Sequence, residues 1–139
     1  RLMALNNNIL PPTQEVVSPS PGCTHQSLPG FREKFAIGSL CIEVYFDLQA
    51  QVIAVREDVG RHSALDKLIG SLYSNKQEHV AGFALLTSRC SHDLVIKAAR
   101  AKLPMLVTLS QPTDLAVASA EQSGLALFSF QQGQLKRFA

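Results

Sequence analysis

The side chains with the greatest capacity for chemistry gather in three short segments, each just before a stretch of helical periodicity. Residues 57–62 read EDVGRH, residues 87–92 read TSRCSH and residues 110–113 read SQPT. Arginine offers a forked donor that matches phosphate, glycine lets a ligand approach the backbone, and Ser or Thr hydroxyls bond to phosphates or base edges. These residue types predict a site for a phosphorylated ligand such as a nucleotide.

A purely structural explanation competes with this prediction. Asp58, Ser91 and Thr113 are residue types that cap helix N-termini. Arg61 and Arg89 can pair with neighbouring carboxylates. Capping statistics favour this explanation for any one segment, and the repetition of the pattern across all three only makes a binding site as well supported as the structural explanation.

Two histidines and two cysteines are further candidates for reactive groups. His62 and His92 could carry protons or bind a ligand, although a histidine in the first turn of a helix is more often packed or hydrogen-bonded. Cys90 stands at a predicted helix start, where the positive end of the helix should lower its thiol pKa. Cys41 lies on a strand predicted to be half-buried, and for both thiols the alternative is an inert core residue.

The periodicity of apolar residues predicts the elements that position these segments. Alternation over residues 40–47 and 52–55 predicts a β-hairpin, and helical spacing predicts a helix over residues 60–75. Strands and helices then alternate, over residues 82–87, 91–102, 104–109, 113–123, 125–130 and 135–138. Nearly all-apolar strands need cover on both faces, so the order predicts an α/β fold, a three-layer α/β/α sandwich with a mixed sheet. Helices would then begin beyond the carboxyl ends of strands, where free N–H groups favour anions.

Composition limits the classes of function. With 139 residues and a formal net charge of +2, we expect one domain and neither nucleic acid nor a membrane as partner. Residues 1–30 are rich in Pro, Asn and Ser and predict a loop-rich arm or linker before a domain at 31–139. Three cysteines without a C-x-x-C pair favour a reducing cytoplasm. The start at Arg1 suggests processing or a fragment of a longer protein.

The three segments also resemble a known family. Residues 56–70 are similar to the FdhD/NarQ family of formate dehydrogenase accessory proteins, whose signature reads E-D-V-G-R-H-N-A-L-D-K, with a departure at Ser63. Residues 87–93 with Lys97 resemble the family's G-R-x-S-x-E stretch, and residues 110–116 resemble its S-x-P-T-x-x-A stretch. The resemblance extends over about residues 35–138.

The resemblance implies a fold, a function and a site. The fold would be cytidine-deaminase-like, and the full-length protein, a homodimer, would act as a sulfurtransferase. It would carry persulfide sulfur from a cysteine desulfurase to the molybdenum bis(guanine dinucleotide) cofactor before that cofactor enters formate dehydrogenase. The cofactor, or a GDP-like ligand, would contact Asp58, Gly60, Arg61, His62, Ser88, Arg89, Ser91, Ser110, Thr113, Phe130, Gln131, Gln132, Gly133 and Gln134.

Three features depart from the family pattern. The family's sulfur-carrying C-x-x-C lies upstream of this domain, and these 139 residues contain no such pair. The family's T-G-G-x-H segment matches residues 37–41 with Cys41 in place of His; the alternative register at residues 22–25 restores the His but demands an insertion. The C-terminal cofactor-binding stretch, residues 130–134, lacks the basic residues common there.

Two other functions fit parts of the sequence. A zinc deaminase would share the fold, but it needs a Cys pair at one helix start and a general-base Glu at the other, and neither helix start here supplies its part. No metal site is therefore expected. A non-catalytic homologue that serves as a nucleotide-binding protein or scaffold for a desulfurase or molybdoenzyme fits the missing thiol pair and Cys41. Metal analysis tests the zinc deaminase hypothesis, and pull-down experiments test the scaffold hypothesis.

Overall fold

A computed structural model of the protein describes residues 40–139, and the predicted arm at residues 1–30 lies outside them. Six strands form one sheet: β1 (Cys41–Asp47), β2 (Val52–Asp58), β3 (Gly82–Leu86), β4 (Met105–Thr108), β5 (Ala126–Gln131) and β6 (Gln134–Arg137). The helices of this part of the chain are α4 (Arg61–Ser74), α5 (His92–Arg100) and α6 (Asp114–Ser123). Each predicted element is present, with ends that differ by up to three residues from those expected.

The sheet is mixed, in the order β2-β1-β3-β4-β5-β6. Strand β1 pairs antiparallel with both β2 and β3, the strands β3, β4 and β5 are parallel, and β6 returns antiparallel to β5. Strands β2, β3, β4 and β5 therefore all point the same way. They end at one margin of the sheet, which we call the carboxyl edge.

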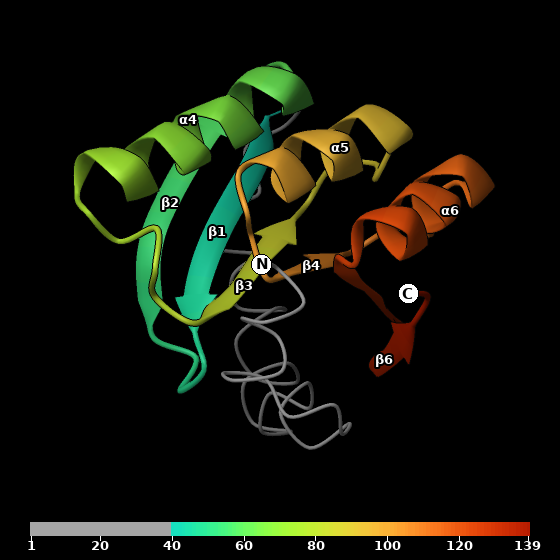
Figure 1. The fold of residues 1–139 in the computed structure, drawn as a ribbon. Helices are drawn as coiled ribbons and strands as arrows, with labels where there is room; N and C mark the ends of the chain where they lie inside the picture. Colours follow the sequence, from blue (N-terminus) through green and yellow to red (C-terminus); the bar gives the residue numbers. More distant parts are fainter. Residues whose placement is uncertain (1–39) are drawn as a thin grey trace.

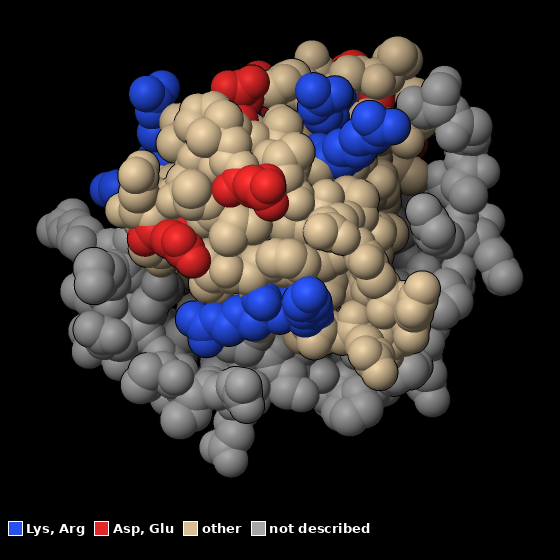
Figure 2. Space-filling view, turned by 90° about the vertical axis from the view of Figure 1, so that its right-hand side faces the viewer, with Lys and Arg blue, Asp and Glu red and all other residues tan. Residues whose placement is uncertain are grey.

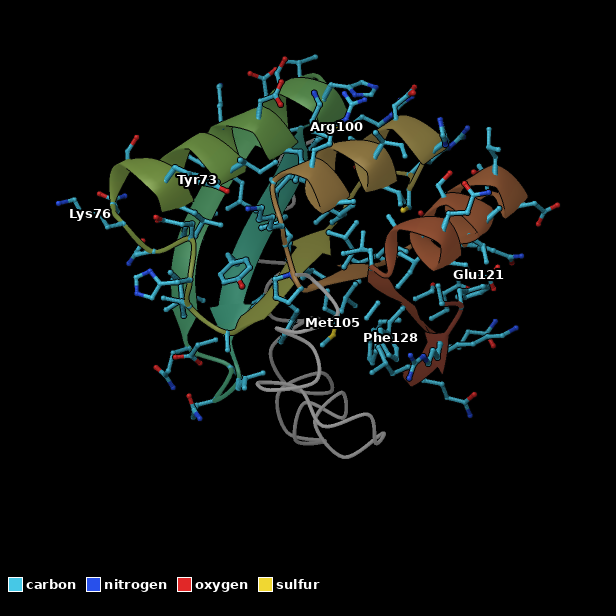
Figure 3. All side chains as sticks on the ribbon, in the orientation of Figure 1. Tyr73, Lys76, Arg100, Met105, Glu121 and Phe128 are labelled. Carbon is cyan, nitrogen blue, oxygen red and sulfur yellow. The ribbon has the colours of Figure 1, made fainter. Side chains whose placement is uncertain are left out.

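All three helices lie on one face of the sheet (Figure 1). Their apolar faces join the inward side chains of the strands in one core that includes Leu68 of α4, Leu94 of α5 and Ala120 of α6. A second cluster lies on the opposite face of the strands and includes Met105 and Phe128, both labelled in Figure 3. The predicted α/β class with a mixed sheet is confirmed; residues 40–139 supply the sheet and one helical layer.

The two strands of the first hairpin differ sharply in burial. Because β1 is paired on both sides, its five central residues are buried, whereas β2 is an edge strand with only Ala54 buried. Gly82, at the start of β3, approaches β1 so closely that a Cβ atom there would stand 1.9 Å from the Phe46 carbonyl oxygen. Only glycine allows this approach.

Local sequence explains where α6 begins and ends and why β5 and β6 are joined by a tight turn. Thr113 caps α6, its side chain accepting a hydrogen bond from the Ala116 amide at 3.1 Å, and Gly124 ends the helix with φ 70°. Between β5 and β6, Gln132 and Gly133 both have positive φ, 51° and 74°. Two such residues match the twist of a tight hairpin.

Charged side chains are spread over the surface. On the face drawn in Figure 2, basic and acidic residues are interspersed rather than gathered into a patch of one sign. This agrees with the formal net charge of +2. Between residues 40 and 139, no helix combines the length and the apolar character needed to cross a membrane.

Candidate functional site at the carboxyl edge

The topology brings the three predicted segments to the same margin of the sheet. Residues 57–62 join β2 to α4, residues 87–92 join β3 to α5, and residues 110–113 join β4 to α6, all at the carboxyl edge. We call them the first, second and third junctions. The start of β1, with Cys41, lies between the first and second junctions because β1 stands between β2 and β3.

At the first junction, Asp58 is held in place as an ionised group. One carboxylate oxygen accepts a hydrogen bond from the Gly60 amide at 3.0 Å, and the other lies 2.6 Å from the Lys67 ammonium nitrogen. The hydrogen bond from Lys67, followed by that from the Gly60 amide, lowers the pKa of Asp58. Asp58 therefore orders the turn before α4 and does not cap the helix.

The N-terminus of α4 carries no side-chain cap. Gly60 occupies the N-cap position in an extended conformation, φ −97° and ψ 127°, that any residue can adopt. A Cβ atom there would meet nothing nearer than the Ser63 hydroxyl at 3.7 Å. The fold does not require glycine at this position, and its absence of a side chain leaves the first-turn amides open to a ligand.

The second junction has an uncapped helix as well. Ser91 is the N-cap of α5, yet its hydroxyl makes no cap hydrogen bond and is a buried atom without a partner among residues 40–139. The neighbouring Ser88 donates from its hydroxyl to Glu43 at 3.3 Å. A buried hydroxyl without a partner is unusual.

At the third junction, Thr113 and Ser110 make hydrogen bonds that stabilise the fold. Besides Thr113 at the cap of α6, Ser110 donates to the Ser88 carbonyl oxygen at 3.3 Å, and its own carbonyl accepts from Ser129 at 2.9 Å. Thr108 also donates to the Ser88 carbonyl, at 3.4 Å. The structural explanation therefore holds for Thr113, while Ser110 ties the second junction to the third.

The two junction arginines are exposed and outside the ion pairs of the described chain. Within residues 40–139, the ion pairs join Lys67 to Asp58 and Lys97 to Asp66, and neither involves Arg61 or Arg89. Pairing with carboxylates thus does not explain these two side chains. One arginine stands at the start of α4 and the other just before α5, beside the two uncapped helices.

The two candidate histidines have different surroundings. His92 Nδ1 lies 2.5 Å from the Ser119 hydroxyl and so links α5 to α6, which is a structural role. His62 is half-buried in the first turn of α4. Gln131, Gln132, Gly133 and Gln134 are exposed at the carboxyl edge, where they form the tight β5–β6 hairpin next to the half-buried Phe130.

The expectation of a lowered pKa at Cys90 is wrong. The helix begins where predicted, but Cys90 is completely buried, and that burial, with the nearby Glu43 carboxyl, raises its pKa to about 12. Loss of hydration of the thiolate outweighs the helix end. Cys41 is only partly buried, and its thiol donates to the Val59 carbonyl oxygen at 3.7 Å.

Glu43 is a residue that sequence reasoning missed. It lies on β1 with 0% of its surface exposed. Burial raises its pKa to about 8, against the smaller opposing effect of the Ser88 hydrogen bond. Its second carboxyl oxygen has no hydrogen-bond partner in the part of the chain that the structure describes. The sequence signal for this site was a glutamate in the middle of an apolar strand. The alternation of apolar and polar residues, however, assigned Glu43 to the face of the strand that was expected to be exposed.

A metal centre finds no support in this part of the chain. Residues 40–139 contain no group of three or more His, Cys, Asp or Glu placed to hold an ion. The zinc deaminase alternative therefore has no donor set among the described residues.

Comparison with known proteins places the chain in a family. The sequence model of the FdhD/NarQ family matches residues 27–138. The chain is 47% identical over 93 residues to the sulfur carrier protein FdhD of Xanthomonas euvesicatoria pv. vesicatoria (strain 85-10), covering 67% of this chain and 33% of that protein. It is 44% identical over 93 residues to the sulfur carrier protein FdhD of Burkholderia mallei (strain ATCC 23344), covering 67% and 34%. The chain thus spans about a third of the length of these curated relatives.

A solved structure agrees on the fold. The crystal structure assigned to a formate dehydrogenase accessory protein of Desulfotalea psychrophila superposes with a TM-score of 0.71 at 23% identity, covering 85% of this chain and 51% of that one. Because the family's sequence model matches residues 27–138, the chain belongs to the FdhD/NarQ family.

Proposed function

We propose that this chain is the ligand-binding part of an FdhD-type accessory protein and that its carboxyl edge binds a guanine dinucleotide cofactor, the molybdenum bis(guanine dinucleotide) group, or a GDP-like part of it. The observation that carries this proposal is the pair of uncapped helices, α4 and α5, each beside an exposed arginine without an ion-pair partner in the described chain. Free amides and guanidinium groups are the donors that phosphates require.

The residues at the two helix starts would each bind one phosphate group. The amides after Gly60 and the Arg61 guanidinium would bind one phosphate, and the α5 start with Arg89 and Ser91 would bind another. Ser91 supports this assignment because its buried hydroxyl lacks a partner. When bound, the cofactor would supply the molybdenum centre that receives sulfur; this chain's residues would hold and orient it.

A thermal-shift experiment tests the site. We expect GDP or GTP to raise the melting temperature of the chain, and Arg61→Ala to abolish that rise. Arg100→Ala is the matched control, because Arg100 is also exposed but lies in the last turn of α5, at the opposite end of that helix (Figure 3). The absence of any shift with guanine nucleotides, or equal shifts in both variants, would contradict the proposal.

In the cell, the full-length protein would take sulfur from a cysteine desulfurase and serve formate dehydrogenase as a cytoplasmic homodimer. The names of the relatives, sulfur carrier protein FdhD, support this role. Pull-down of a desulfurase and of formate dehydrogenase by the full-length gene product tests the partners. A diverged scaffold is the second candidate, favoured by Cys41 at the position where the family pattern has His; capture of both partners without sulfur transfer would support it.

A further inference from the structure

A carboxyl group in the interior of the sheet contacts the second junction. Glu43 of β1 has 0% of its surface exposed, and by the alternation of the strand it lies on the helix side of the sheet, with Tyr45. Its first carboxyl oxygen accepts a hydrogen bond from the Ser88 hydroxyl at 3.3 Å. Ser88 directly precedes Arg89, the exposed arginine beside α5. Glu43 is therefore bonded to the neighbour of a side chain in the proposed phosphate site.

Ser88 is held from two sides. Its carbonyl oxygen accepts hydrogen bonds from the hydroxyls of Thr108 at 3.4 Å and Ser110 at 3.3 Å, while its own hydroxyl donates to Glu43. These contacts join the turn before Arg89 to β1 on one side and to the third junction on the other. Arg89 takes part in no ion pair of residues 40–139. The place of its guanidinium group therefore depends on the turn that Ser88 holds.

The fold alone does not account for a glutamate at this position. The second carboxyl oxygen of Glu43 is buried and has no hydrogen-bond partner among residues 40–139. Leu86 of β3 stands opposite Glu43 in the sheet, and the helices cover this side with apolar side chains. Burying an unpaired carboxyl oxygen costs free energy, so an apolar residue of similar size would stabilise the strand better. The contact that Glu43 does provide, to Ser88, indicates a role at the second junction.

We propose that Glu43 is a positioning residue: through Ser88 it holds Arg89 in place for an anionic group at the start of α5, and it does so as an uncharged acid. This inference rests on the proposed function, because Arg89 is one of the donors assigned there to a phosphate. An ionised carboxylate this close would attract the Arg89 guanidinium and repel a phosphate, whereas the neutral acid still accepts the hydrogen bond from Ser88. Anion binding is therefore coupled to the proton on Glu43.

The groups around Glu43 decide where this coupling lies on the pH scale. Burial has the largest effect and raises the pKa of Glu43 to about 8, against the smaller opposing effect of the Ser88 hydrogen bond. The titratable and charged residues on this side of β1 and beside it are Cys41 and Tyr45 of β1, Arg56 of β2, Arg61 at the start of α4, and Cys90 and His92 at the second junction. The pKa values of Cys41, Tyr45 and Cys90 are raised above their ordinary values, so these groups keep their protons while Glu43 loses its own. As pH rises through 8, Glu43 adds a negative charge to the junction, and anion affinity should fall.

Calorimetric titration of the purified chain with GDP, and separately with inorganic diphosphate, tests this coupling. For the natural chain we expect the affinity to fall by about fivefold or more from about pH 7 to about pH 9. Glu43→Gln keeps an acceptor for Ser88 but has no proton to lose, so its affinity should match that of the natural chain at the lower pH and exceed it at the higher pH. Ionisation of the ligand affects both proteins alike, so the difference between them reports Glu43. Tyr45→Phe, on the same face of β1, is the control and should keep the fall.

A second variant, Glu43→Leu, tests the hydrogen bond to Ser88 rather than the charge. Because leucine offers no acceptor to Ser88, the affinity for both ligands at neutral pH should weaken by about threefold or more. An affinity equal to that of the natural chain would mean that Glu43 does not position Arg89. An equal fall with pH in Glu43→Gln and in the natural chain would also overturn the inference.

The natural chain by itself gives a test that depends on no variant. An affinity that stays constant between the two pH values overturns the inference. Diphosphate binding with the expected fall, but no binding of GDP, would contradict the guanine-nucleotide proposal and support this inference. Absence of binding of either ligand contradicts both.

Discussion

The starts of α4 and α5 differ from the start of α6, although all three lie at the same edge of the same sheet. Thr113 caps α6 with its side chain, whereas Gly60 and Ser91 leave α4 and α5 without a side-chain cap. The exposed arginines follow the same division, since Arg61 and Arg89 stand at the two uncapped starts. Two helix starts therefore have no side-chain cap, and at the third a side chain caps the helix and holds the fold together.

Segments of similar sequence therefore have different roles in this fold. All three segments combine small polar residues with a helix start, yet the third is fixed by hydrogen bonds from Ser110 and Ser129. The second junction also rests on an ionisable group, Glu43, through the hydrogen bond from Ser88. Substitutions at each junction separately test this difference.

The largest expected effect is on the pH dependence of stability, through Glu43. Its folded pKa is about 8 against an ordinary value of 4.5, so the folded state binds the proton more tightly than the unfolded chain. Stability is therefore full below about pH 4.5 and falls as pH rises through 8, by on the order of 5 kcal/mol for this group. Glu43→Gln should remove this loss.

Urea unfolding at about pH 5 and pH 9 measures the effect. The natural chain should lose stability between the two values, and the Glu43→Gln variant should lose much less. Tyr45→Phe is a control on the same strand, because it removes a buried hydrogen bond, from the Tyr45 hydroxyl to the Val80 carbonyl at 2.7 Å, without removing a carboxyl. If Glu43→Gln still loses stability between these pH values, Glu43 is not the group that causes the loss.

A smaller effect is expected at the third junction. Thr113→Ala removes the side-chain cap of α6, with a hydrogen bond of 3.1 Å to the Ala116 amide, and should lower the free energy of unfolding by about 1 kcal/mol. The stabilisation by GDP should stay unchanged, because this junction is structural. Chemical denaturation and the thermal shift measure the two quantities. A lost GDP shift in Thr113→Ala would erase the distinction between the junctions.

The elements that could be predicted from sequence are those with strong local signals. The helix over residues 113–123 is confirmed, with Thr113 as its cap and Asp114–Ser123 as its body, because a capping Thr and a following Gly124 mark both ends. The position of the α5 start was also predicted. The identity of the carboxyl edge followed from strand direction, which alternating strands and helices determine.

The chemistry of Glu43 and Cys90 could not be predicted, because it depends on sheet order. Alternation in residues 40–47 indicates which side chains share a face, but not that β1 is an interior strand with both faces covered. That placement buries Glu43 and raises its pKa. Cys90 likewise lies at a helix start, as expected, but it is completely buried by residues that only the tertiary fold brings together.

The smallest effect on stability, and the sharpest comparison with Thr113, is expected at Ser91. Both residues are N-caps, but the Ser91 hydroxyl is buried without a partner, so Ser91→Ala removes no hydrogen bond. The free energy of unfolding should change by less than about 0.5 kcal/mol, or rise slightly. The GDP shift should fall instead, because a ligand would lose the donor that the fold leaves free. Substitutions at Ser91 and Thr113 should therefore have opposite consequences: one affects binding and the other affects folding. A loss of stability at Ser91 equal to that at Thr113, with binding intact, would mean that α5 is capped in solution and that only α4 offers an open helix start.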